Sequence, residues 1–267
     1  MLAVKRPAVL LPGPGPLYVY AILPGEVSLF PGIVGLAGTP LTAVSWGALA
    51  AATSPIASVE LRPTPENLLR HEAVVEQLRR TTRALPVRFG TTFENSTRVQ
   101  QVLAQRHDTL LADLARIGDK VEMGLTVLWD PDGEEVAEGA DQPAEGVGPG
   151  TSYLQARLAQ HRREESRRSQ ARVLAREVAA ILRGHASASQ TRCLPTPRLA
   201  LSAAYLVTPA RLGAFGEAFE EVRRTHSDLR FLLSGPWPPY SFVTPPDRAG
   251  AASLPVNIQS GTGERCC

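Results

Sequence analysis

Cysteine is scarce in this chain, whose 267 residues include three, Cys193, Cys266 and Cys267. Three cysteines, of which two are adjacent, do not make a disulfide framework and indicate a reducing compartment. Excess charge is also lacking, because the formal net charge is +2. A chain this close to neutral gives no reason to expect nucleic acid or an acidic membrane surface as its partner.

The sequence also lacks an unbroken apolar run that would serve as a secretory signal or a membrane span. A signal needs roughly 7–15 apolar residues in succession, but prolines at positions 7, 12, 14 and 16 interrupt the N-terminal stretch. The most apolar later stretch, residues 41–57, is shorter than the ~20 residues needed to cross a bilayer. We therefore expect a cytoplasmic protein.

Motifs for metal, nucleotide or nucleophile chemistry are missing as well. The histidines are scattered without a His-Glu-x-x-His pair, no Gly-Lys-Ser/Thr follows a glycine-rich loop, and no Gly-x-Ser-x-Gly occurs. Cys193 has no base near it in the sequence, and the adjacent Cys266 and Cys267 are too close for a zinc site. The sequence predicts no metal, no cofactor and no enzymatic activity.

The pattern of apolar residues predicts an α+β protein of two domains. The N-terminal domain spans 17–130, after a flexible segment at 1–16. It contains a strand at 17–23, further strands within 41–53, helices at 64–80 and 96–117, and an alternating strand at 120–129. Thr64 followed by Pro65 predicts the start of the first helix.

The second domain follows an acidic linker at 131–150. Residues 130–150 contain seven acidic residues and no basic one. A domain at 151–243 then has a helix at 152–183 with a solvated middle, a strand at 198–207, a helix at 208–226 and a strand at 229–235. This alternation suggests a ferredoxin-like fold that borrows strand 120–129, followed by a flexible tail at 244–267.

Two stretches hold the candidate site residues. In "LPVRFGTTF" (85–93), Arg88 lies between apolar neighbours and precedes Phe89, so Arg88 either pairs locally or makes a specific inter-domain or partner contact. In "FLLSGPWPPYSFV" (231–243), we expect Gly235-Pro236 to end the strand. Its aromatic residues would pack the exit against the fold or dock on a partner; they are Trp237, Tyr240 and Phe242.

Four blocks in order resemble the gas vesicle protein GvpF/GvpL family. They are "YVYAIL" (18–23), "LPVRFGTTF" (85–93), "KVEMGLTVLW" (120–129) and "LRFLLSGPWPPYSFV" (229–243), of which the last is the most specific. The resemblance implies a two-domain α+β accessory protein of gas vesicle formation, without catalytic residues. It also implies binding to the small hydrophobic shell protein and other gas vesicle proteins, with a role either early in assembly or as a minor vesicle component.

Two alternatives stay open from the residues themselves. One is a small-molecule-binding or enzymatic α+β protein that uses Arg88 and the loop at 235–243, and it predicts a concave polar pocket. The other is a nucleic-acid-binding protein that uses the basic helix at 161–176, which lacks the aromatic residues that usually stack on bases.

Overall fold

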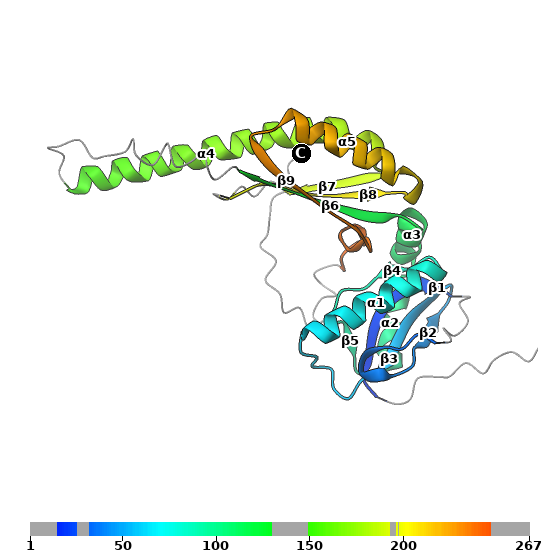
Figure 1. Cartoon of the computed structure of the whole chain (residues 1–267). Coiled ribbons are helices and arrows are strands. Elements are labelled where there is room, and N and C mark those ends of the chain that lie inside the picture. Colours follow the sequence, from blue (N-terminus) through cyan, green and yellow to red (C-terminus); the bar gives the residue numbers. More distant parts are fainter. Residues whose placement is uncertain (1–14, 26–31, 130–148, 193–195, 197, 247–267) are drawn as a thin grey trace, which may run out of the picture. The chain divides into compact units, whose positions relative to one another are not determined.

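The computed structural model describes residues 15–25, 32–129, 149–192, 196 and 198–246 (Figure 1). The described residues form two compact units. The first runs up to Lys120 and resumes at Pro238, and the second runs from Val121 to Trp237. This division differs from the boundaries at 130 and 243 drawn from the sequence, because residues 121–129 pair with strands of the second unit.

The first unit is built around an antiparallel sheet with β1 (Leu17–Pro24) in its interior. β1 pairs with β3 (Leu49–Pro55), β4 (Leu85–Pro86) and β5 (Thr92–Phe93), and β3 pairs with β2 (Thr42–Trp46). Every residue of β1 except the last is buried. Burial on both faces explains why its apolar and aromatic residues follow one another without the alternation of a half-exposed strand.

Helix α1 (Pro65–Thr81) begins where the sequence predicts, and its cap is confirmed. The Thr64 hydroxyl accepts the N–H of Asn67 at 3.3 Å, which satisfies one of the free donors of the first turn. The buried face of α1 packs with β1; it consists of His71, Val74, Val75 and Leu78.

The prediction of a single helix at 96–117 is wrong, because the structure has two helices over this range. α2 (Ser96–Gln105) and α3 (His107–Ile117) meet at Arg106, whose φ of −110° and ψ of 13° interrupt the helical backbone. α2 packs on β2 and β3, whereas α3 packs on β1 and β4. Because one straight helix cannot follow both pairs of strands, the break lets each half bury its own apolar stripe.

The second unit has the element order of a ferredoxin-like fold. Its elements are β6 (Val121–Trp129), α4 (Pro149–Leu182), β7 (Ala188–Arg192), β8 (Leu199–Val207), α5 (Leu212–Thr225) and β9 (Leu229–Trp237). The strands form one antiparallel sheet in the order β7-β8-β6-β9. The strand-helix-strand-strand-helix-strand sequence with this order confirms the predicted fold class.

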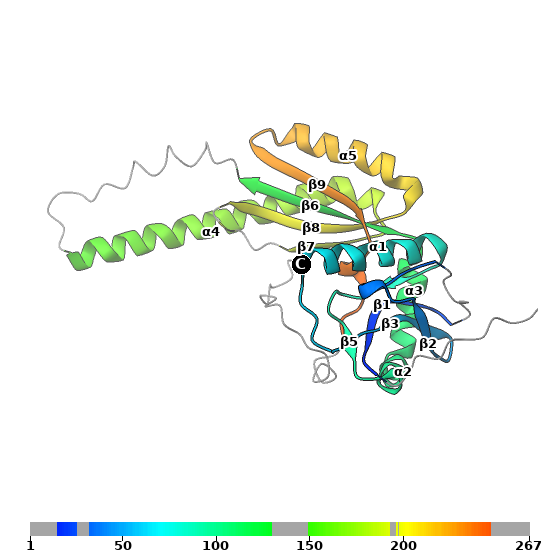
Figure 2. The ribbon, with the colours of Figure 1, turned by 60° about the horizontal axis from the view of Figure 1, so that its bottom comes forward.

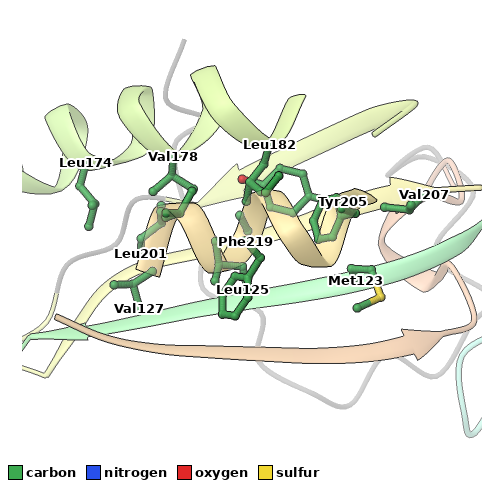
Figure 3. Close-up of a cluster of buried hydrophobic side chains, with 14 of the residues drawn as sticks. Met123, Leu125, Val127, Leu174, Val178, Leu182, Leu201, Tyr205, Val207 and Phe219 are labelled. Carbon is green, nitrogen blue, oxygen red and sulfur yellow. The ribbon is translucent and has the colours of Figure 1, made fainter. Parts of the chain in front are cut away.

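The core of this unit lies between α4, α5 and one face of the sheet (Figure 3). Leu125 and Val127 of β6 face Phe219 of α5, together with Val178 and Leu182 of α4. Only the C-terminal part of α4 takes part, and the helix extends past the sheet in both views (Figures 1 and 2). The middle of α4 is solvated, as its lack of an apolar stripe predicts.

The prediction that Gly235-Pro236 ends the last strand is wrong. β9 continues to Trp237, which pairs with Glu122 across an irregularity in the ladder. Gly235 has a φ of +120°, and a Cβ built on it would lie 2.7 Å from the Glu122 carbonyl oxygen. A residue without a side chain is therefore required for the strand to continue at this close approach.

Candidate functional site

The structure separates the five predicted site residues into exposed and buried ones. Arg88 is exposed and Phe89 is half-buried in the loop after β4. Trp237 is 53% exposed at the end of β9, so the expectation that it packs against the fold is wrong. Tyr240 and Phe242 lie in the short 3-10 turn η6 (Tyr240–Phe242), where Phe242 is 3% exposed, so their packing role is confirmed.

Tyr240 belongs to a cluster around His71 that joins three segments of the first unit. The imidazole of His71 is fully buried, and its Nδ1 lies 2.9 Å from the Tyr18 hydroxyl of β1. Its Nε2 lies 3.2 Å from the Tyr240 hydroxyl. The Phe89 ring meets the imidazole edge to face at 5.7 Å. Three of the four sequence blocks, those around residues 18, 89 and 240, thus converge on one histidine of α1.

The other tyrosine of β1, Tyr20, also packs against His71. Its ring stacks on the His71 imidazole with centroids 5.8 Å apart. Its hydroxyl accepts the N–H of Leu36 at 2.7 Å and lies 2.8 Å from the hydroxyl of Ser54. Leu36 opens the 3-10 turn η1 (Leu36–Gly38), so Tyr20 also ties this turn to the sheet.

The direction of each hydrogen bond follows from the number of protons available. The Tyr18 hydroxyl accepts the N–H of Gly90 at 3.1 Å, so its own proton is directed to His71 Nδ1. His71 then carries its proton on Nε2 and donates it to the Tyr240 hydroxyl. Tyr240 donates in turn to Glu72 Oε1 at 2.9 Å, and the exposed Glu72 ends the chain of bonds at the surface.

Burial keeps this cluster uncharged at neutral pH. It lowers the pKa of His71 to about 4, a shift that the nearby backbone at Val87 partly offsets. It raises the pKa of Tyr18, and it raises the pKa of Tyr240 further, with the Glu72 carboxylate adding to the shift. A histidine far from its ordinary pKa is poorly placed for proton transfer near pH 7. The arrangement is suited to holding segments in place.

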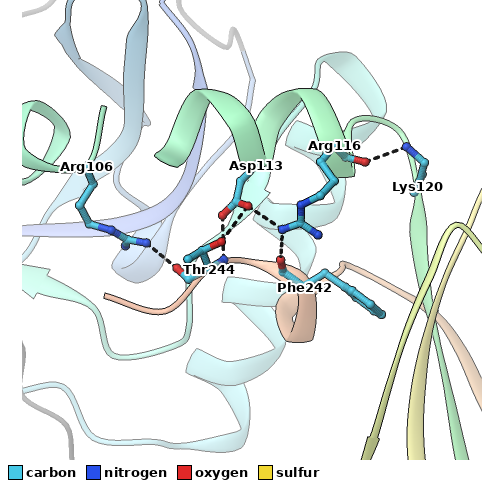
Figure 4. Close-up of polar contacts among 6 residues, drawn as sticks. All are labelled: Arg106, Asp113, Arg116, Lys120, Phe242 and Thr244. Atoms are coloured by element: carbon cyan, nitrogen blue, oxygen red, sulfur yellow. Dashed lines mark hydrogen bonds and ion pairs between the residues drawn. The ribbon is translucent and has the colours of Figure 1, made fainter. Parts of the chain in front are cut away.

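A second polar group holds the residues after Phe242 (Figure 4). The buried Asp113 carboxylate of α3 accepts three bonds, from Arg116 Nη2 at 2.6 Å, from the Thr244 N–H at 2.7 Å and from the Thr244 hydroxyl at 2.9 Å. Arg116 Nη2 also donates to the Phe242 carbonyl at 2.6 Å. Arg106 Nη2 donates to the Thr244 carbonyl. Residues 238–246 therefore pack on the first unit although they follow a strand of the second.

Sequence reasoning missed both His71 and Asp113, although their spacing marks them. His71 occupies the first position of the stripe 71, 74, 75 and 78, and Asp113 lies within the stripe 110, 113, 114 and 117. A polar residue at a buried position of an amphipathic helix needs a partner inside the protein. The partners in the final segment are distant in sequence: Tyr240 is 169 residues from His71, and Thr244 is 131 residues from Asp113.

The described residues contain no group of three or more His, Cys, Asp or Glu side chains arranged to hold a metal ion. Among the helices of the same residues, none combines the length and the apolar character that a membrane crossing requires. The carbonyl oxygen of the exposed Arg88 accepts a local hydrogen bond from the Thr91 hydroxyl at 2.8 Å.

Fold and site together define a two-unit α+β protein with a ferredoxin-like second unit, in which the last segment returns to the first unit. Against known families, the model "Gas vesicle synthesis protein GvpL/GvpF" matches residues 16–244. The chain therefore belongs to the GvpL/GvpF family of gas vesicle proteins. The match ends at Thr244, the residue that Asp113 holds.

Individual relatives and solved structures resemble the chain over most of its length. It is 29% identical to gas vesicle protein L of a Streptomyces species, over 85% of this chain and 92% of the relative. It is also 29% identical to gas vesicle protein F2 of Halobacterium salinarum, over 85% and 91%. The crystal structure of GvpF from Anabaena has the same fold, with a TM-score of 0.70 at 20% identity over 87% of this chain and 99% of that one.

Proposed function

We propose that this chain is a non-enzymatic accessory protein of gas vesicle formation that binds the small hydrophobic shell protein and other gas vesicle proteins during assembly. The observation that carries the proposal is the family match over residues 16–244. The relatives with the names gas vesicle protein L and F2 support the same process. The family sets the process, and the molecular role within it is our inference.

Surface chemistry supports a binding role. A small shell subunit with a large apolar surface aggregates in water unless a partner covers that surface. The second unit exposes large apolar side chains, among them Leu232 at 61% and Trp237 at 53%. Of the five residues predicted as partner contacts, Arg88 and Trp237 are the exposed ones. We assign these two to partner binding and the other three to the internal structure.

The polar clusters support a role without catalysis. His71 and Asp113 are two buried polar residues of the first unit, and both have hydrogen-bond partners on residues 240–244. These bonds join the final segment to α1 and α3. We propose accordingly that the protein needs no cofactor.

The proposed location is the cytoplasm and the gas vesicle, with the protein retained as a minor component of the finished particle. Purified vesicles probed with an antibody against this chain test the retention. Signal that survives washing in high salt supports it, and signal only in the soluble fraction contradicts it while leaving the assembly role intact.

Affinity capture tests the binding role directly. The tagged full-length chain, co-expressed with the shell protein, is expected to retain it, and a strain without this gene is expected to lose normal vesicles. Trp237→Ala is expected to weaken capture about tenfold, the loss typical of an exposed tryptophan in an interface. Trp46→Ala, at a tryptophan that is 40% exposed in the first unit, is the matched control. No capture by the wild type together with normal vesicles in the deletion strain would refute the proposal.

A further inference from the structure

The ferredoxin-like sheet ends in a long edge strand. In the order β7-β8-β6-β9, the last strand pairs with β6 on one side, and within the described residues no strand pairs with its other side (Figure 2). Successive residues of a strand direct their N–H and C=O groups to alternate sides. Every second residue of β9 therefore presents a donor and an acceptor at this outer edge, where another extended chain can meet them.

The other sheet edges of the described chain are shorter or covered. β7, at the opposite edge of the same sheet, has five residues and ends in Arg192. In the first unit, β4 and β5 have two residues each, and β2 has five and packs against α2. β9 has nine residues. It is the one described edge long enough to receive several residues of a partner strand.

The composition of β9 is that of an unprotected edge. Proteins usually protect an edge from pairing with lysines and other charges, with prolines or with bulges. β9 has the sequence LRFLLSGPW, with a single charged residue, Arg230, and a proline only near its end. Leu232, near its middle, is 61% exposed. A large apolar side chain exposed beside free backbone groups favours pairing with another apolar strand.

We propose that the outer edge of β9 binds an extended apolar segment of a partner protein by strand addition. The inference rests on the proposed function, so the segment belongs to the small hydrophobic shell protein. Gly235 departs from strand geometry with a φ of +120°, and Pro236 has no N–H. The N–H of Leu229 already donates to the His226 carbonyl at 3.2 Å. The usable edge is therefore 230–234, which fits a partner segment of about five residues.

The face on which Leu232 lies sets the chemistry of that segment. Leu232 is opposite Thr126 of β6, and Arg230 is opposite Leu128 on the same face. A residue of the added strand beside Leu232 buries against it if it is apolar. A residue beside Arg230, two positions away, is best neutral or acidic, because a like charge directly opposite is destabilising. The edge thus selects an apolar, non-basic strand.

Backbone pairing has a signature that contacts between side chains lack. Fluorescent peptides of overlapping sequence, which cover the shell protein, are titrated with the full-length chain. The peptide that binds is then resynthesised with N-methyl groups on alternate residues, in two complementary sets. One set is expected to lose about tenfold or more in affinity, because its N–H groups face β9. The other is expected to stay within about twofold.

Variants of the protein test the same edge from the other side. Leu232→Lys places a charge at the centre of the edge and is expected to weaken peptide binding about tenfold. Leu69→Lys makes the same change at a leucine of α1 that is 72% exposed, and is expected to bind as the wild type does. Because both leucines are exposed, both variants are expected to keep the wild-type melting temperature.

Each result decides between distinct conclusions. If the wild type captures the shell protein and Leu232→Lys captures it equally well, the edge site is wrong while the proposed function stands. If both N-methyl sets bind equally, strand addition is wrong. A wild-type dimer that Leu232→Lys abolishes in sedimentation would show that a second copy occupies the edge, which also overturns the assignment. If the wild type captures no shell protein, the proposed function itself fails.

Discussion

The contact between Asp113 and Thr244 gives the sharpest test of how residues 238–246 are held. The perturbation is Asp113→Asn, which keeps the shape of the side chain and replaces one oxygen by an NH2 group. One carboxylate oxygen faces the Thr244 N–H at 2.7 Å, and the other faces Arg116 Nη2 at 2.6 Å. Whichever way the amide is turned, its NH2 group meets a donor. One of the two bonds is therefore lost.

The size of the effect follows from the burial of the carboxylate, which is 4% exposed. A hydrogen bond to a charged group contributes about 1.5–3 kcal/mol, and an unsatisfied buried donor adds to the loss. The attraction to Arg116 contributes less, because that side chain is 46% exposed and solvent screens its charge. We expect Asp113→Asn to lower the free energy of unfolding by about 2–3 kcal/mol.

Denaturation in urea measures this loss, and hydrogen exchange locates it. The amides of residues 242–246 are expected to exchange faster in Asp113→Asn than in the wild type, since the Thr244 N–H loses its acceptor. Asp228→Asn, at an exposed aspartate in the turn before β9, is the matched control and is expected to leave both measurements unchanged. An Asp113→Asn protein with wild-type stability and wild-type exchange at 242–246 would refute the role of this carboxylate.

Two further perturbations test the cluster around His71 and the end of β9. Burial lowers the pKa of His71 from 6.5 to about 4, so the unfolded chain binds a proton in this range and the folded one does not. The free energy of unfolding is therefore expected to decrease by roughly 3 kcal/mol as the pH is lowered from about 6.5 to 4. Denaturation at a series of pH values measures this decrease. Gly235→Ala is expected to lower the free energy of unfolding by about 1–3 kcal/mol, and with it the melting temperature, because its Cβ would meet the Glu122 carbonyl at a φ of +120°.

Both predictions have controls within the chain. His71→Gln cannot titrate, so the fall of stability in this pH range is expected to be smaller by the contribution of His71; an equal fall would contradict the assignment. Gly213→Ala, at a helical glycine of α5 with open space around it, is expected to be neutral or stabilising. If Gly235→Ala were equally well tolerated, the close approach to β6 would not constrain this residue.

Local pattern was enough to predict most helices and strands and the ferredoxin-like order. The alternation of Val121–Trp129 and the cap at Thr64 each depend on residues that are close together in the sequence, and the structure confirms both. The four sequence blocks were likewise enough for the family. These features depend on spacing over a few residues, which a single sequence displays directly.

The break at Arg106 depends on which strands the two helix halves cover, and no local signal carries that information. The same holds for the residues after Trp237. Their aromatics look alike in sequence, yet Trp237 is exposed at the end of one unit, whereas Tyr240 and Phe242 pack on the other.

The sequence by itself determined most of the secondary structure, the fold class and the family, because each depends on neighbouring residues or on blocks read in order. The tertiary structure alone decided that His71 and Asp113 are the buried partners of the final segment, and that no described strand pairs with the outer edge of β9. Those outcomes depend on groups more than a hundred residues apart in the chain, such as Asp113 and Thr244 at a separation of 131. Such groups meet only when the helices and strands have packed.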